Sequence, residues 1–194
     1  MPRGARLIEE NGTYHITSRG NNKRRLFRWR HEFKSFKRLM LFYKNKYNIL
    51  IYHYVVMVNH IHLCIKATKD ADISKFMQGL QLAYFNYHNK RTGYVGHLFQ
   101  GRFFSNIIAH DNYLLASSLY IERNPVMAGS VKNPEDYQWS SYRHYAFGEK
   151  DPLIDTNPFY YDLGKTDEKR QKYYRELMYN SIQEVKQKNF CVTL

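Results

Sequence analysis

Two histidines separated by one residue, His60 and His62, are the first candidates for chemistry in this sequence. They open a segment, residues 60–67, whose apolar residues recur with the period of a β-strand. Because successive strand residues point to opposite faces, both imidazoles lie on one face, and Cys64 follows on that face. Two adjacent imidazoles can bind one divalent metal ion. They can equally be half-buried strand histidines with hydrogen-bonded rings, and so short a pattern leaves both interpretations open.

A tyrosine in the second half of the chain is the next candidate. Tyr120 and Asn124 are four residues apart in a segment, residues 111–124, that predicts a helix, so their side chains share one face. Small residues on the same face leave room beside the phenol. The chain has 18 tyrosines, so a packing role for Tyr120 stays open. We expect the helix to stop near Asn124, because Pro125 disfavours helical geometry in the residue before it.

A basic segment, residues 19–30, is the third element. Its Lys and Arg side chains can neutralise phosphates, and Phe27 and Trp29 could stack on unpaired bases. The alternative is a solvated run of charge with its aromatic residues in the core. The composition favours the first interpretation, because 30 Lys and Arg against 17 Asp and Glu give a net charge of +13. Such a surplus predicts attraction to a polyanion.

The positive charge is unevenly distributed. Residues 1–50 contain 13 Lys and Arg against 3 acidic residues, whereas residues 111–194 contain 11 against 12. The surface that meets a polyanion should therefore come mainly from the first quarter of the chain. A membrane is not the expected partner, because the longest apolar stretch, residues 49–58, is far shorter than the ~20 residues of a spanning helix. No apolar segment follows Arg3 and Arg6, so we expect no export signal and a cytoplasmic protein.

The elements that must position these residues follow from hydrophobic periodicity. Segments rich in β-branched and aromatic residues predict strands, and apolar stripes at helical spacing predict helices. The predicted order is strand 14–18, helix 31–47, strand 49–58, strand 60–67, helix 72–91, strand 103–109, helix 111–124 and a last helix 166–188. This β-α-β-β-α-β order is that of a ferredoxin-like, split βαβ antiparallel sheet in an α+β protein. Ile61, Leu63 and Ile65 would face two covering helices, and the two histidines would lie on the open face.

Five short stretches, in this order, resemble a known family. They are residues 14–22 (YHITSRGNN), 56–63 (VMVNHIHL), 96–103 (GHLFQGRF), 120–129 (YIERNPVMAG) and 139–142 (WSSY). The residues His60-Ile61-His62 are similar to the His-hydrophobic-His motif of HUH single-strand nucleases. The whole set resembles the single-tyrosine HUH transposases (IS200-like), especially the branch of REP-associated tyrosine transposases. Val58 departs from the pattern, since relatives usually have proline there, which alters the turn but not the histidines.

The resemblance, which covers roughly residues 7–145, implies a fold and a domain organisation. Residues 1–150 would form the HUH nuclease domain, with two helices on one face of the sheet and the catalytic helix near the other. Residues 151–194 would add a linker and a C-terminal helical extension. The resemblance leaves open whether the chain acts alone or as a homodimer.

The resemblance also implies roles for the candidate residues. Tyr120 would be the nucleophile and would form a 5′-phosphotyrosine intermediate. His60 and His62 would bind a divalent metal ion, Mg²⁺ or Mn²⁺, with Asn124 as a third ligand. The reaction would be metal-dependent cleavage and rejoining of single-stranded DNA by a transposase. No residue of the sequence stands out as the base that takes the proton of Tyr120.

The substrate implied by the resemblance is single-stranded DNA next to a hairpin. The basic residues expected to bind it are Arg19, Lys23, Arg24, Arg25, Arg28 and Arg102. Two alternatives remain at this point. One is an HUH replication initiator or relaxase with the same chemistry, and the other is a non-catalytic nucleic-acid-binding module.

Overall fold

The computed structural model describes residues 8–109 and 111–192, with residues 111, 112 and 188–192 described by their backbone alone. Its strands are β1 (Thr13–Arg19), β2 (Ile49–Val56), β3 (His60–Ala67) and β4 (Phe104–Ile107). Its α-helices are α1 (Arg30–Lys46), α2 (Ile73–Thr92), α3 (Asp111–Met127), α4 (Tyr142–Phe147) and α5 (Asp167–Val192). Short 3₁₀ helices cover η1 (Asn21–Lys23), η2 (Pro134–Asp136) and η3 (Pro158–Leu163).

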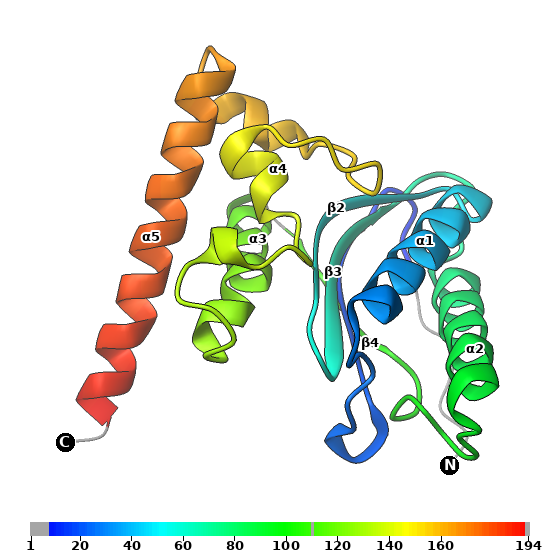
Figure 1. Ribbon diagram of the computed structural model, residues 1–194. Coiled ribbons are helices and arrows are strands. Elements are labelled where there is room, and N and C mark those ends of the chain that lie inside the picture. Colours follow the sequence, from blue (N-terminus) through cyan, green and yellow to red (C-terminus); the bar gives the residue numbers. More distant parts are fainter. Residues whose placement is uncertain (1–7, 110, 193–194) are drawn as a thin grey trace.

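The four strands form one antiparallel sheet in the order β2-β3-β1-β4. The strands β1 and β3 are therefore neighbours, although α1 and β2 separate them along the chain. Helices α1 and α2 lie on one side of the sheet, and α3, α4 and α5 lie on the other (Figure 1). This is the split βαβ arrangement of a ferredoxin-like sheet, so the predicted α+β fold class is confirmed.

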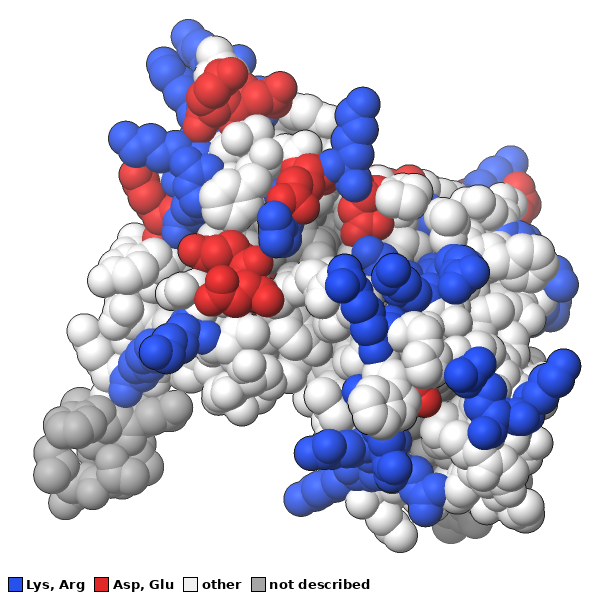
Figure 2. Space-filling view, viewed as in Figure 1, with Lys and Arg blue, Asp and Glu red and all other residues white. Residues whose placement is uncertain are grey.

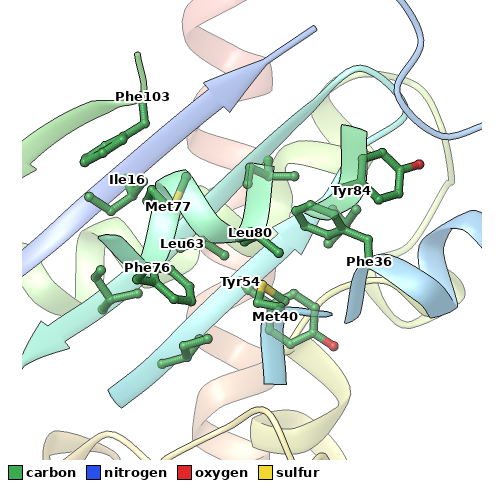
Figure 3. Packing of buried hydrophobic residues seen from close by; sticks show 14 of the residues in the cluster. Ile16, Phe36, Met40, Tyr54, Leu63, Phe76, Met77, Leu80, Tyr84 and Phe103 are labelled. Carbon is green, nitrogen blue, oxygen red and sulfur yellow. The ribbon is translucent and has the colours of Figure 1, made fainter. Parts of the chain in front are cut away.

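The main core lies between the sheet and the helices α1 and α2 (Figure 3). Strand residues such as Ile16 and Leu63 pack there against Phe36 of α1 and against Phe76 and Leu80 of α2. All five side chains are completely buried. Along β3, the alternate residues Ile61, Leu63 and Ile65 belong to this core. The predicted orientation of β3 is therefore confirmed, and the intervening residues face the other side.

A smaller apolar cluster attaches α3 to the opposite face of the sheet. Leu114 and Ile121 of α3 pack there against Val55 of β2 and Cys64 of β3. Cys64 is completely buried in this cluster, and burial raises the pKa of its thiol. The prediction that Cys64 shares the face of the two histidines is confirmed, but its neutral thiol is packed among apolar residues.

Helix α3 runs further than the sequence predicts. It continues through Pro125 to Met127 rather than stopping near Asn124. A proline has no N–H to donate to the carbonyl four residues earlier, which is that of Ile121. The side-chain amide of Asn124 supplies a donor instead, with Nδ2 at 3.3 Å from the Ile121 carbonyl oxygen and 2.6 Å from that of Tyr120. The predicted helix end is therefore wrong, because Asn124 compensates locally for the proline.

The C-terminal helix packs on α3 rather than on the sheet. Tyr174, Met178 and Ile182 of α5 form a third apolar cluster with Leu119 and Val126 of α3. Helix α3 thus contacts the sheet along one side and α5 along another. Two separate apolar contacts therefore hold the helix that carries Tyr120.

The segment before η3 crosses back to the sheet and α1. Leu153 is buried in the main core, and Asp151 accepts a hydrogen bond of 2.9 Å from the ammonium of Lys37 on α1. The side chain of Asp155 accepts from the backbone N–H of Ile51 at 2.8 Å.

Within the described residues, no helix has the length and apolar character that crossing a membrane would require.

Candidate active site between the sheet and the third long helix

The two histidines of β3 lie side by side at the start of the strand, on the face toward α3. Their ring centroids are 5.0 Å apart and their planes are nearly perpendicular. His60 is half-buried, and His62 is only 6% exposed. The strand alternation predicted from the sequence therefore holds, and both imidazoles belong to one site.

In each of the two histidines, Nδ1 has a hydrogen-bond partner. Nδ1 of His60 lies 2.7 Å from Oδ1 of Asn59, the residue before it. Nδ1 of His62 lies 2.9 Å from Nε2 of His15 and 3.1 Å from Oγ1 of Thr17, both on β1. A second hydrogen bond of this kind fixes the ring of a metal-binding histidine and leaves its other nitrogen for the metal.

Burial keeps both histidines neutral near physiological pH. Desolvation, with smaller contributions from the neighbouring His60 and His15, lowers the pKa of His62 to about 3. Desolvation also lowers the pKa of His60, with a second contribution from the charge of Arg19. A neutral imidazole is the form that binds a metal ion, so the pair fits that role without having to lose a proton.

Tyr120 lies over the histidines on the exposed face of α3. Its ring centroid is 5.7 Å from that of His62 and 5.7 Å from that of His15. The side chain is 42% exposed, so a substrate can reach the phenol. The structure thus brings together, within one chain, the tyrosine and the histidine pair that are 58 or more residues apart in the sequence.

Asn124, the expected third ligand, is half-buried one turn beyond Tyr120. Its Nδ2 atom is committed to backbone carbonyls of α3, and this leaves Oδ1 as the atom that could ligate a metal. Among the described residues, no group of three or more His, Cys, Asp or Glu side chains could hold a metal ion. A divalent ion here would therefore take two imidazoles from the chain and its remaining ligands from amide, phosphate or water oxygens.

Arg123 is a neighbour of Tyr120 that sequence reasoning missed. Its guanidinium carbon lies 5.6 Å from the centroid of the Tyr120 ring. The same guanidinium donates to the side-chain and backbone oxygens of Ser181 on α5. The C-terminal helix therefore contacts the site through this arginine. The signal in the sequence was the spacing of three residues on a predicted helix, which places Arg123 beside Tyr120.

A buried carboxylate anchors the helix that carries Tyr120. Glu122 is completely buried, and its carboxylate accepts hydrogen bonds from the Tyr174 hydroxyl of α5 at 2.7 Å and from the Ser141 hydroxyl. It also pairs with Nδ1 of His53 on β2 at 2.9 Å. A β-bulge next to Ile51 turns His53 toward α3. Strict alternation would have placed His53 on the opposite face, so this contact could not be predicted from the strand pattern.

We expect Glu122→Ala to destabilise the fold by about 3–5 kcal/mol, because it leaves a buried histidine and two hydroxyls without their acceptor. Urea unfolding followed by circular dichroism measures this change. Glu149→Ala is the matched control, since Glu149 pairs with Arg143 on the surface and its loss should cost less than about 1 kcal/mol. Equal effects of the two substitutions would contradict a structural role for Glu122.

The six basic residues predicted to bind DNA are all exposed. Five of them lie in the segment from the end of β1 to the start of α1, and a cluster of Lys and Arg lies where that loop is located, at the bottom of the view in Figure 2. Most acidic side chains in this view lie over or beside α4 and α5. Trp29 is 65% exposed, whereas Phe27 is fully buried in the main core. The prediction that Phe27 stacks on bases is therefore wrong.

The basic segment, residues 19–30, forms a loop (the basic loop) that is hydrogen-bonded to the turn before the two histidines. The backbone N–H groups of Gly20 and Leu26 donate to the carbonyls of Asn59 and Val58, each at 2.8 Å. Arg19 pairs with His60 in the register of β1 and β3. The loop and the histidines are therefore parts of one continuous surface.

Arg102, the sixth basic residue, lies apart from this loop in the sequence. It lines an open groove of about 770 Å³ between α2 and residues 96–103. Amide and aromatic side chains such as Gln78, Gln81 and Phe85 line the same groove. The groove reaches Asn21, so it adjoins the basic loop.

Comparison with known proteins identifies the family. A family model described as "Transposase IS200 like" matches residues 9–124. Among solved structures, one described as a REP-associated tyrosine transposase bound to a REP hairpin matches with a TM-score of 0.65 and 21% sequence identity, over 81% of this chain and 93% of that chain. A putative transposase from Deinococcus radiodurans matches with a TM-score of 0.44 and 16% identity, over 63% of this chain and 97% of its own. No curated protein matches the chain.

The family model covers more than half of the chain and includes His60, His62, Tyr120 and Asn124. The structural match shows that the chain shares its fold with a REP-associated tyrosine transposase. The matched residues contain both halves of the site, on β3 and on α3. The chain therefore belongs to the IS200-like transposase family.

Proposed function

We propose that this transposase cuts and rejoins single-stranded DNA next to hairpins, in a metal-dependent reaction through a tyrosine-linked intermediate. The observation that carries the proposal is the position of the Tyr120 ring, 5.7 Å from that of His62 on an accessible face. A phenol beside two neutral imidazoles supplies a nucleophile and a metal-binding pair in one place. Neither a binding module nor a packing role requires that arrangement.

The proposed reaction begins with attack of the Tyr120 oxygen on the scissile phosphorus. The bond from phosphorus to the 3′-oxygen breaks, which leaves a free 3′-hydroxyl and a 5′-phosphotyrosine. When bound at His60 and His62, a divalent ion would polarise the phosphate and stabilise the charge that develops on it. The phosphotyrosine linkage is itself a phosphodiester and retains its reactivity. A 3′-hydroxyl of another strand can therefore attack it and release Tyr120.

Two observations support a hairpin as the bound DNA. The basic loop is hydrogen-bonded to the turn before His60, and the groove that contains Arg102 adjoins this loop. Together they offer positive charge, amides and an exposed indole. The solved REP-associated tyrosine transposase that shares this fold is bound to a REP hairpin. We therefore assign the loop and groove to hairpin binding and the face beneath α3 to cutting.

The test uses a hairpin with single-stranded flanks, Mn²⁺ and the full chain. Label at the 3′ end of the DNA should stay with the protein after denaturation, since a 5′-phosphotyrosine retains the downstream strand. Label at the 5′ end should appear in a shorter free fragment. Mass spectrometry should place the adduct on Tyr120. Retention of the 5′-end label by the protein would contradict the proposed chemistry. The absence of an adduct on every such strand would contradict it as well.

A second strand with a free 3′-hydroxyl, added after cleavage, tests the transferase step. We expect a joined product and loss of the adduct. A replication initiator that only nicks its own origin should not join the cut hairpin end to a new target. The transferred product therefore separates the transposase reaction from that alternative.

Neutralising the basic loop should weaken DNA binding without affecting cleavage at saturating DNA. We expect Arg24→Ala with Arg25→Ala to reduce hairpin affinity on the order of tenfold near 150 mM salt and to lower the slope of log K against log salt by about 1.5. Fluorescence anisotropy over a salt series measures both quantities. The matched control is Lys169→Ala with Lys172→Ala, which removes the same charge from the exposed side of α5. Equal losses for the two pairs would mean that only net charge matters.

A further inference from the structure

Two residues of the first family-like stretch, His15 and Thr17, take no direct part in the proposed reaction. Both lie on β1, where Tyr14 and Ile16 point into the main core. His15 and Thr17 alternate with these core residues, so they point to the other face of the sheet, on the side of α3. In the register of the sheet, Thr17 is the partner of His62. The two side chains are therefore next to the histidine pair.

The contact between His15 and His62 is specific in its atoms. Nε2 of His15 lies 2.9 Å from Nδ1 of His62, and the rings are stacked with centroids 5.1 Å apart. Oγ1 of Thr17 reaches the same Nδ1 atom at 3.1 Å. Among the described residues, no hydrogen bond engages Nε2 of His62. One nitrogen of His62 thus has two partners on β1, and the other faces the site.

A neutral imidazole carries one proton, which decides which nitrogen can bind a metal. If Nδ1 of His62 carries the proton, it donates to His15 and the lone pair of Nε2 is available to a cation. If His15 donates instead, the proton of His62 lies on Nε2 and blocks that position. The direction of this single hydrogen bond therefore decides whether His62 is competent as a ligand.

We propose that His15 is a positioning residue whose Nε2 accepts a hydrogen bond from Nδ1–H of His62 and thereby holds Nε2 of His62 ready for a divalent cation. This inference rests on the proposed function, because it concerns the same pair of histidines. It requires that the proton of His15 itself lie on its Nδ1 atom. Thr17 supports the same ring from the side.

The neighbouring histidine shows the same arrangement with a different acceptor. Nδ1 of His60 is 2.7 Å from Oδ1 of Asn59, and a carboxamide oxygen can only accept, so His60 carries its proton on Nδ1. Both histidines of the pair then present Nε2 toward the site. His15 does for His62 what the amide of Asn59 does for His60.

The first test needs no metal, no DNA and no variant. Long-range ¹H–¹⁵N NMR of the metal-free chain, labelled at histidine, reports which ring nitrogen of each histidine carries the proton. We expect protonated Nδ1 and unprotonated Nε2 in His62, and the same in His15. A proton on Nε2 of His62 would overturn the proposal, whatever the chain does to DNA.

The second test measures binding of Co²⁺ by its visible absorption, again without DNA. His15→Phe removes the acceptor and should weaken binding about 10- to 100-fold. His15→Gln places an oxygen near the position of Nε2 and should bind within about threefold of the original chain. The control is His88→Gln, since His88 is a buried histidine on α2, and its substitution should leave Co²⁺ binding unchanged.

The outcomes separate this proposal from its alternatives. Equal losses in His15→Phe and His15→Gln would overturn it and would indicate that His15 is itself a ligand. Full affinity in His15→Phe would overturn it by showing that the contact is dispensable. The expected protonation with graded Co²⁺ affinities, but no DNA adduct, would uphold the positioning role and count against the proposed reaction alone.

Discussion

Tyr120→Phe is expected to abolish the covalent adduct and DNA cleavage, with a loss on the order of 10⁴-fold or more. The substitution removes only the hydroxyl, which is the atom proposed to attack phosphorus. Hairpin affinity should stay within about twofold, because the basic loop is unchanged. The melting temperature should barely move, since the side chain is 42% exposed. Denaturing gels of 3′-labelled DNA and anisotropy with the same hairpin measure the two properties.

Tyr113→Phe is the matched control for this prediction. Tyr113 is also an exposed tyrosine of α3, seven residues earlier on the same face. It should retain its adduct at the original rate. An adduct that persists in Tyr120→Phe and disappears in Tyr113→Phe would show that the wrong tyrosine was assigned. Loss of DNA binding in Tyr120→Phe would show that the phenol acts in recognition.

His60→Ala is expected to remove metal-dependent cleavage to a similar extent. A chelator should stop cleavage by the original chain, and added Mn²⁺ should restore it, whereas Mn²⁺ should not restore His60→Ala. The physical reason is that, among the described residues, two imidazoles are placed to hold the ion, and losing His60 removes one of them. Titration of Mn²⁺ by electron paramagnetic resonance, together with single-turnover cleavage, measures both effects.

His97→Ala serves as the control, because His97 is exposed in the loop that borders the groove near α2. It should bind Mn²⁺ as the original chain does. Cleavage that survives both the chelator and His60→Ala would rule out a metal at this pair. The tyrosine chemistry would then have to rely on the side chains alone, with Arg123 as a cation beside Tyr120.

The structure shows where the positive charge of the chain lies. The sequence predicts that the basic surface comes from the first quarter of the chain, and the exposed end of β1 with the loop after it carries five of the six expected residues. That loop is hydrogen-bonded to the turn before His60. The surfaces proposed for DNA binding and for cutting are therefore adjacent.

Much of the fold follows from local periodicity in the sequence. The period of two in β3 places His60 and His62 on one face and Ile61, Leu63 and Ile65 on the other, as the structure confirms. Apolar stripes at helical spacing predict α1 and α2, because each must bury one face against the sheet. These patterns work because strand and helix geometry are set by neighbours along the chain.

Predictions from local patterns were wrong in two cases. In one, a side chain replaced a missing backbone hydrogen bond, and in the other, contacts with distant segments determined the burial of a residue. Pro125 predicts a helix end, yet the amide of Asn124 replaces the missing donor and α3 continues. Phe27 belongs to a basic loop, yet it packs against Phe36 and Tyr84 in the core. Neither outcome can be derived from the spacing of residues in the segment itself.

The sequence by itself determined the element order, the shared face of the two histidines, the helix that carries Tyr120 and the location of the positive charge. Only the tertiary structure placed Tyr120 beside that pair, with His15 behind His62 and Glu122 anchoring α3 to His53 and Tyr174. The physical reason is the range of the interactions. Periodicity reports which face a residue takes within one element, whereas these contacts join elements whose approach depends on packing across the whole molecule.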